Sequence, residues 1–240
     1  MESFGARLDL KKKFLFTCAA ILLFVCQAWA QGTLPGVYST GVDASGNVLP
    51  AGQTDPHYTI TSSPLGATSA TTVAFMPVEW AANTASSGWI NATGSGNDIE
   101  ALGNYTYTLS FSMNGFDLST AEISGEWTSD NESEIFFNGV DTGFFSGTNG
   151  FGAFSPFSIT NGFVSGQNQL QFVVTQEGGS GPINPEGLQV NITSATASPV
   201  PEPATFSLLG LAGLLLGKLR RNQTTTPSQG SPDRRKRRAG

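Results

Sequence analysis

The chain has no basic residue over most of its length. All twelve lysines and arginines lie at or before Lys13 or at or after Lys218, whereas residues 31–199 contain fourteen aspartates and glutamates. The formal net charge of this segment is therefore −14, although that of the whole chain is −6. Because lysine and arginine contacts dominate the affinity of proteins for phosphate backbones, this absence excludes nucleic acid as a partner.

Cysteine and histidine are also scarce. Cys18 and Cys26 lie in an apolar N-terminal stretch, and His57 is the only histidine. Beyond that stretch there is no thiol for a disulfide, a nucleophile or a metal site. A single histidine leaves little for a transition-metal site or a Ser-His-Asp triad, and no pair of carboxylates is singled out by its spacing. We therefore expect a protein that is not an enzyme, with a polysaccharide hydrolase as the least favoured alternative.

The first thirty residues have the three parts of a secretory signal peptide. Lys11–Lys13 supply positive charge, and Phe14–Val25 form an apolar run of twelve residues. Ala28 and Ala30 then form an A-x-A-like cleavage site. The run is shorter than the about twenty residues that span a bilayer. We predict a cleavable signal helix over residues 1–30, handled by the Sec translocon and signal peptidase.

A proline-rich acidic box opens onto an apolar stretch near the C-terminus. The box consists of Val200, Pro201, Glu202 and Pro203, and a basic cluster of Lys218, Arg220 and Arg221 follows the apolar residues 204–217. Because lysine and arginine resist translocation, the cluster should keep this end in the cytoplasm. The order predicts a single membrane-spanning helix over residues 204–217 and a basic cytoplasmic tail over residues 222–240.

This combination resembles the PEP-CTERM sorting signal over residues 199–221. The resemblance implies recognition and cleavage near the Pro201–Pro203 box by an exosortase, in bacteria that also make exopolysaccharide. It also implies a precursor anchored in the inner membrane of a Gram-negative-type bacterium. From there, the protein would pass to the cell surface or the extracellular matrix.

Residues 31–198 show the period of β-strands rather than that of helices. Within residues 105–113, apolar side chains alternate with threonine and serine, and residues 170–175 and 188–193 alternate in the same way. Further strand candidates are residues 72–80, 121–127, 134–137 and 157–163. Asn-Gly pairs at positions 114, 138, 149 and 161 suit the turns between strands. The pattern predicts an all-β fold, an antiparallel β-sandwich or jelly roll of about seven to nine strands, with residues 31–71 as a loose edge or linker.

Three short motifs resemble the galactose-binding-like jelly-roll domains found on PEP-CTERM proteins. They are W-x-x-D-N at residues 127–131, N-G at 138–139 and G-x-N-x-L-x-F-x-V at 166–174. The resemblance covers residues 122–196 and implies the jelly-roll fold. This chain has Gln189 where related sequences usually carry an arginine, so it lacks a group for bidentate hydrogen bonding to a ligand.

Oxygen-bearing side chains are densest over residues 130–141. The candidates for a ligand or calcium loop are Asp130, Asn131, Glu132, Asn138 and Asp141. In a negative domain without cations, a calcium ion held there would relieve repulsion between carboxylates. The alternative is a solvated acidic turn between strands, with no cofactor.

Three tryptophans are candidates for stacking on the faces of sugars: Trp80, Trp89 and Trp127. The alternative is that these large side chains fill the core. Together the patterns favour an exported, PEP-CTERM-sorted surface or matrix protein associated with exopolysaccharide. The alternative is a lectin-like carbohydrate-binding module, with or without calcium.

Overall fold

The computed structural model describes residues 31–179 and 181–200. The predicted signal helix, membrane helix and basic tail lie outside these residues. Within the described part there are eleven strands and two single-turn 3-10 helices (Leu118–Thr120 and Gly150–Gly152), and none of its helices is long and apolar enough to cross a membrane. The strands are β1 (Gly32–Thr33), β2 (Thr54–Ser62), β3 (Ser69–Thr72), β4 (Ile90–Asn91), β5 (Gly103–Ser112), β6 (Glu122–Asp130), β7 (Glu132–Phe137), β8 (Val140–Ser146), β9 (Ser155–Ile159), β10 (Gln167–Gln176) and β11 (Gly187–Ala197).

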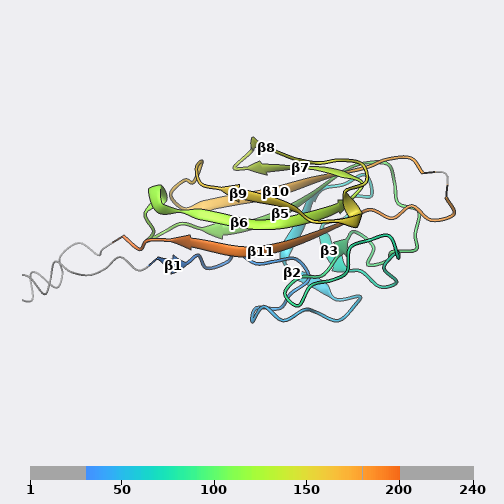
Figure 1. The fold of residues 1–240 in the computed structure, drawn as a ribbon, viewed down its shortest axis with the longest axis horizontal. Coiled ribbons are helices and arrows are strands. Elements are labelled where there is room, and N and C mark those ends of the chain that lie inside the picture. Colours follow the sequence, from blue (N-terminus) through green and yellow to red (C-terminus); the bar gives the residue numbers. More distant parts are fainter. Residues whose placement is uncertain (1–30, 180, 201–240) are drawn as a thin grey trace, which may run out of the picture. The chain divides into compact units, whose positions relative to one another are not determined.

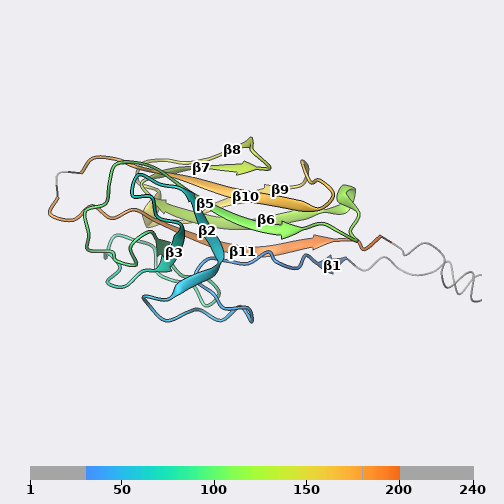
Figure 2. The same ribbon diagram turned by 180° about the vertical axis from the view of Figure 1, so that it is seen from behind.

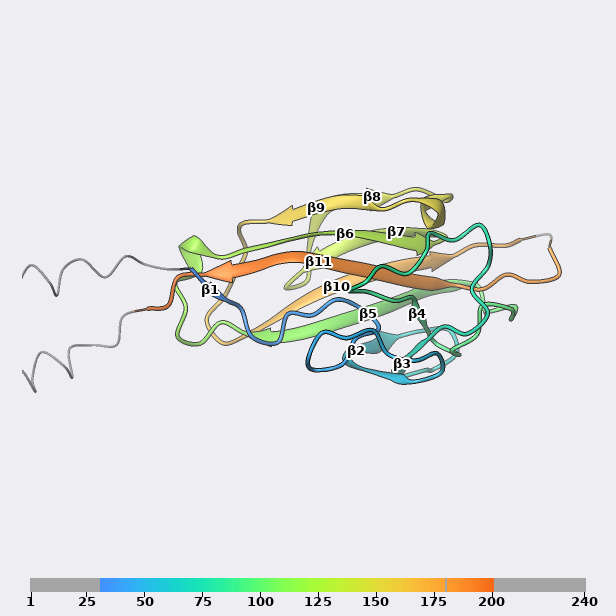
Figure 3. The same cartoon turned by 60° about the horizontal axis from the view of Figure 1, so that its bottom comes forward.

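The strands form one hydrogen-bonded path that folds back over itself. The order is β8-β7-β10-β5-β2-β3-β4-β11-β6-β9, with β1 added to β11, and every pair is antiparallel. The long strands are aligned along a common axis (Figures 1 and 2), and neighbouring strands run in opposite directions along it. Strands β11 and β6 lie over β10 and β5 (Figure 3). The short β3 and β4 link the two layers. The predicted all-β, antiparallel class is confirmed.

Side-chain alternation sets the register of the central strands. Leu109 of β5 is opposite Leu170 of β10, and Tyr107 is opposite Phe172. These four side chains are buried, whereas those of the next pair along, Gln169 and Ser110, are exposed. Because successive side chains point to opposite faces of a strand, this register places one apolar row of each strand in the core.

Aromatic rings from both layers fill the space between them. The Trp127 ring of β6 meets Phe144 of β8 and Phe157 of β9 edge-on, with ring centroids 6.3 and 5.9 Å apart. Phe157 in turn contacts Phe172 of β10 at 6.0 Å. Edge-to-face contacts of this kind add to the stabilisation from burial. Within the described residues, the buried apolar side chains form one core cluster that runs from Leu34 to Ala197.

Two predictions about local structure differ from the structure. Residues 31–71 were predicted to be a loose edge or linker; β1 does pair only with β11, but the segment also supplies β2 and most of β3 and buries Leu34 and Tyr58 in the core. The Thr40 backbone N–H also donates to the carbonyl of Val190, 3.0 Å away. Polar composition hid this role, since a serine- and threonine-rich strand gives little apolar signal.

The predicted strand over residues 72–80 is a loop. Strand β3 ends at Thr72, and beyond it Phe75 has a positive φ of 59°, which a strand cannot adopt. Phe75 and Val78 are 76% and 93% exposed. The apolar residues here follow one another without alternation, so the segment has no single face to bury in a sheet.

Candidate functional site

The predicted acidic cluster is divided between two turns. Asp130, Asn131 and Glu132 lie where β6 passes into β7, whereas Asn138 and Asp141 lie at the far end of β7. The six residues of β7 span about 20 Å at the usual rise per residue. The five residues therefore do not form one calcium loop. Among the described residues, no three histidine, cysteine, aspartate or glutamate side chains come together as a metal group.

Both carboxylate oxygens of Asp130 are used in hydrogen bonds within the protein. Its side chain is buried, and its Oδ2 accepts a hydrogen bond from Trp80 Nε1 at 2.7 Å while Oδ1 accepts one from Asn131 Nδ2 at 2.7 Å. Burial raises the pKa of Asp130 to about 6, and the hydrogen bond from Trp80 acts in the opposite direction. The carboxylate therefore anchors the loop that carries Trp80 to the end of β6.

The three tryptophans are core residues. Trp80, Trp89 and Trp127 are 5%, 1% and 1% exposed, and the first two stack on each other with centroids 4.1 Å apart. Trp89 Nε1 donates to the Ala81 carbonyl and Trp127 Nε1 to Ser133 Oγ. Their faces are covered by protein, so the predicted stacking on sugars is wrong for all three. Whether an aromatic residue is in the core depends on contacts that its local sequence does not specify.

Asn138 also has a structural role. Its Nδ2 donates to the Gly162 carbonyl at 2.9 Å and to Asn168 Oδ1 at 2.8 Å, and its Oδ1 accepts from the Gln169 backbone N–H at 2.8 Å. Its φ of 51° suits the first position of a two-residue Asn-Gly hairpin turn. The residue ties the β7–β8 turn to Gly162, which lies between β9 and β10, and to the beginning of β10.

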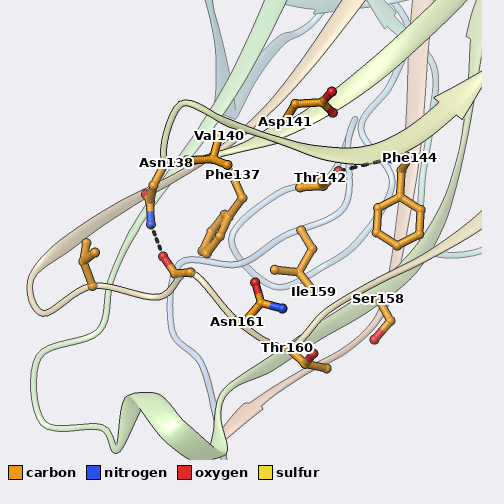
Figure 4. A pocket seen from close by; sticks show the side chains of 12 residues that line it. Phe137, Asn138, Val140, Asp141, Thr142, Phe144, Ser158, Ile159, Thr160 and Asn161 are labelled. Atoms are coloured by element: carbon orange, nitrogen blue, oxygen red, sulfur yellow. Dashed lines mark hydrogen bonds between the residues drawn. The ribbon is translucent and has the colours of Figure 1, made fainter.

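A cavity of about 370 Å³ lies between that turn and the segment after β9. Apolar side chains form one part of its lining and short polar side chains the rest: Phe137, Val140, Phe144, Ile159 and Val164, and Asn138, Asp141, Thr142, Ser158, Thr160 and Asn161. Figure 4 shows the Ile159 side chain and the Asn161 amide directed into the cavity, whereas the Asp141 carboxylate points away. Asp141 Oδ1 instead accepts the Gly143 backbone N–H at 2.8 Å.

The cavity has the composition of a site for a small polar ligand with apolar faces. Pockets of this kind combine apolar walls with a few directed polar groups. Sequence reasoning found Asn138 and Asp141 but missed Ser158, Thr160 and Asn161, which come from a different part of the chain. The Asn161-Gly162 pair was assigned only to a turn, and no local pattern indicates that it lies opposite the β7–β8 hairpin.

The end of β11 leads directly into the predicted sorting box. The backbone N–H of Val200 donates to the Gly115 carbonyl at 2.8 Å, and the N–H of Asp117 donates to the Ser198 carbonyl at 2.8 Å. Strand β1 pairs Gly32 with Ala197. The first residues after the predicted signal cleavage site therefore lie beside the last residues before the box.

Comparison with known proteins identifies the tail. The PEP-CTERM protein-sorting motif matches residues 199–222, which confirms the predicted sorting signal. The motif marks the chain as an exported protein made as a membrane-anchored precursor. No curated protein matches the chain. Among solved structures, one described as "Structure of a family 35 carbohydrate binding module from an environmental isolate" is similar at 14% identity and a TM-score of 0.29, over 54% of this chain and 90% of that one. Similarity at this level establishes neither a shared ligand nor a shared function.

Proposed function

We propose that this protein is a non-enzymatic component of the cell surface or extracellular matrix that works alongside exopolysaccharide. The observation that carries the proposal is the sorting motif, which begins at the hydrogen-bonded end of the β-domain. With no spacer between them, the domain itself is the cargo of the sorting tail. Inner membrane and exosortase are then partners of the precursor, and the matrix is the destination.

The charge of the domain restricts the kind of polysaccharide that it would contact. Residues 31–199 contain fourteen acidic and no basic residues. An acidic polysaccharide would be repelled unless divalent cations bridged the two surfaces. A neutral polysaccharide can instead hydrogen-bond to the many serine, threonine, asparagine and glutamine side chains without this electrostatic cost. We therefore favour a neutral exopolysaccharide.

Removal of the sorting box should abolish delivery to the surface. We expect the triple replacement Pro201→Ala, Glu202→Ala and Pro203→Ala to leave the precursor in the inner membrane, because the exosortase no longer recognises it. Immunoblots of membrane, surface and medium fractions from a host with an exosortase would measure this. Pro227→Ala, in the tail beyond the motif, is the matched control and should be sorted normally. A wild-type chain found in the cytoplasm with both ends intact would contradict the proposal.

A second candidate function is carbohydrate binding in the cavity beside the β7–β8 turn. The side-chain amide of Asn161 points into the cavity, and no hydrogen bond joins it to another described residue. An unused amide beside the apolar Ile159 and Phe144 could pair with a sugar hydroxyl while the apolar groups contact the ring. The arrangement favours a short stretch of a neutral glycan.

Glycan binding can be tested on the purified chain with a glycan array, run with calcium and again with a chelator. We expect saturable binding to a narrow set of neutral sugars, weakened roughly two- to tenfold by Asn161→Ala because one directed hydrogen bond is lost. Asn97→Ala, an exposed substitution outside the cavity lining, is the control. Binding that Asn161→Ala leaves unchanged would remove the cavity as the site, and an array without any binding would remove this candidate function.

A further inference from the structure

Two glutamates from separate loops meet inside the domain. Glu100 lies in the loop before β5 and Glu186 directly before β11, and they are 3% and 0% exposed. Their two carboxyl groups are within hydrogen-bonding reach of each other. The loops are joined beside them, because the Glu100 backbone N–H donates to the Asn184 carbonyl at 3.1 Å.

Each carboxyl group uses only one of its oxygens. Oε1 of Glu100 accepts from Thr93 Oγ1 at 2.8 Å and from Asn91 Nδ2 at 3.2 Å. Oε1 of Glu186 accepts from the Tyr107 hydroxyl and from a backbone N–H at 3.0 Å. The two Oε2 atoms are buried and receive no hydrogen bond from any other described residue, so only a proton shared between the two carboxyl groups would pair them. Buried carboxylate oxygens normally have a hydrogen-bond partner, because moving such an oxygen out of water costs free energy unless a new hydrogen bond replaces those to water.

No basic side chain of the domain can neutralise this pair. Residues 31–199 contain no lysine or arginine, and the single histidine, His57, stacks on Tyr38 instead. Burial raises the pKa of Glu100 to about 7 and the pKa of Glu186 well above its usual value. The charge of Glu100 adds to the rise for Glu186, whereas the hydrogen bond between the two side chains lowers the pKa of Glu100. The protein therefore offers this pair no cation, and its charge is neutralised either by bound protons or by a bound cation.

A third buried oxygen that lacks a hydrogen-bond partner in the described part of the chain belongs to a side chain that binds the same loop. Gln176, at the end of β10, is 2% exposed, and its Oε1 has no hydrogen-bond partner among the described residues. Its Nε2 donates at 2.6 Å to the Asn184 carbonyl, the same oxygen that accepts the Glu100 N–H. Carboxylate and amide oxygens are hard ligands, which suit calcium and magnesium rather than transition metals.

We propose that Glu100 and Glu186 bind one calcium ion between their free oxygens, with neutral oxygens completing the ligand set. Two carboxylates balance the charge of a divalent cation, and calcium tolerates the irregular geometry that loop ligands provide. The ion would join the segment before β5 that carries Glu100 to the residues directly before β11 that include Glu186, and so order this end of the sandwich. This site is distinct from the divided acidic cluster at β7, and it requires neither glycan binding nor a role in the matrix.

The test is the thermal stability of the full chain in mild detergent at pH 7.5, with calcium chloride or with a chelator. At free calcium about a hundredfold above Kd, we expect the Tm of the wild type to rise by roughly 5–10 °C, because the ion binds only the folded state. Glu100→Gln and Glu186→Gln should each abolish most of this rise. Glu134→Gln, which removes an exposed carboxylate from β7, should leave it intact. Titration with terbium gives a second readout, since the adjacent Tyr107 should sensitise its luminescence and calcium should quench it competitively.

Two results would overturn the proposal. A wild-type Tm that is the same in calcium and in chelator, without sensitised terbium emission, would mean that the pair holds a shared proton instead. A calcium-dependent rise that persists in Glu186→Gln would mean that calcium binds elsewhere. If the glutamine variants fail to fold, the wild-type Tm and the stoichiometry of calcium binding by calorimetry decide the question.

Discussion

Trp127→Ala is expected to lower the free energy of unfolding by about 3–5 kcal/mol. The indole is 1% exposed and lies between the layers, in edge-on contact with Phe144 and Phe157. Its removal loses the burial of a large apolar surface and leaves a cavity that β6, β8 and β9 cannot close. It also removes the Nε1 hydrogen bond to Ser133, whose hydroxyl is buried beside that of Ser129.

Urea unfolding followed by far-ultraviolet circular dichroism would measure the loss. Trp127→Phe is the matched variant, because it retains an aromatic ring and should cost clearly less than Trp127→Ala. At the usual scaling for a domain of this size, the alanine variant should also melt roughly 10 °C lower. A loss below about 1 kcal/mol would show that the two layers do not depend on this residue for their packing.

Gly187→Val is expected to cost about 3 kcal/mol, at the upper end of the range for overpacked cores. A Cβ atom at position 187 would lie 2.5 Å from Trp80 and 3.1 Å from Trp89, so the stacked pair would have to move. Movement of Trp80 would also break its hydrogen bond to Asp130. The glycine is needed here for close approach of two rings, not for an unusual backbone angle.

The control for this prediction is Gly147→Val, at an exposed position where the nearest atom to an added Cβ is 3.9 Å away. We expect it to change stability by less than about 0.5 kcal/mol. Near-ultraviolet circular dichroism would report displacement of the tryptophan pair in Gly187→Val and none in the control. Equal stabilities of the two variants would contradict the proposed packing of Trp80 over β11.

Strands were predictable where their side chains alternate and lie on two clearly different faces. Tyr105, Tyr107 and Leu109 alternate with threonines, and the predicted strands β5 and β10 are present with these residues buried. Strand β11 is also present, but Gln189, predicted on its wet face, is buried and hydrogen-bonded to Ser87. Prediction was poorer at the sheet edges and in the links between layers. Strands β1 and β4 have two residues each, too few for any period to be visible.

The candidate sites were harder to predict than the strands, because they combine segments that are far apart in the chain. Their closeness in the sequence grouped Asp130 with Asp141. Strand β7 lies between them, however, so the two residues are at opposite ends of that strand. Conversely, Asn161 meets the β7–β8 turn only because β9 runs along the edge of β6. Local patterns contain no information about such long-range contacts.

The sequence by itself determined the charge of the domain, its all-β character and its sorting tail. Each of these is a property of composition or of a short contiguous pattern. Only the tertiary structure decided that the three tryptophans are buried, that residues 31–71 belong to the sandwich, and that Glu100 faces Glu186. The physical reason is that burial and the pairing of charges depend on which strands become neighbours, and that choice is made by the packing of the whole core.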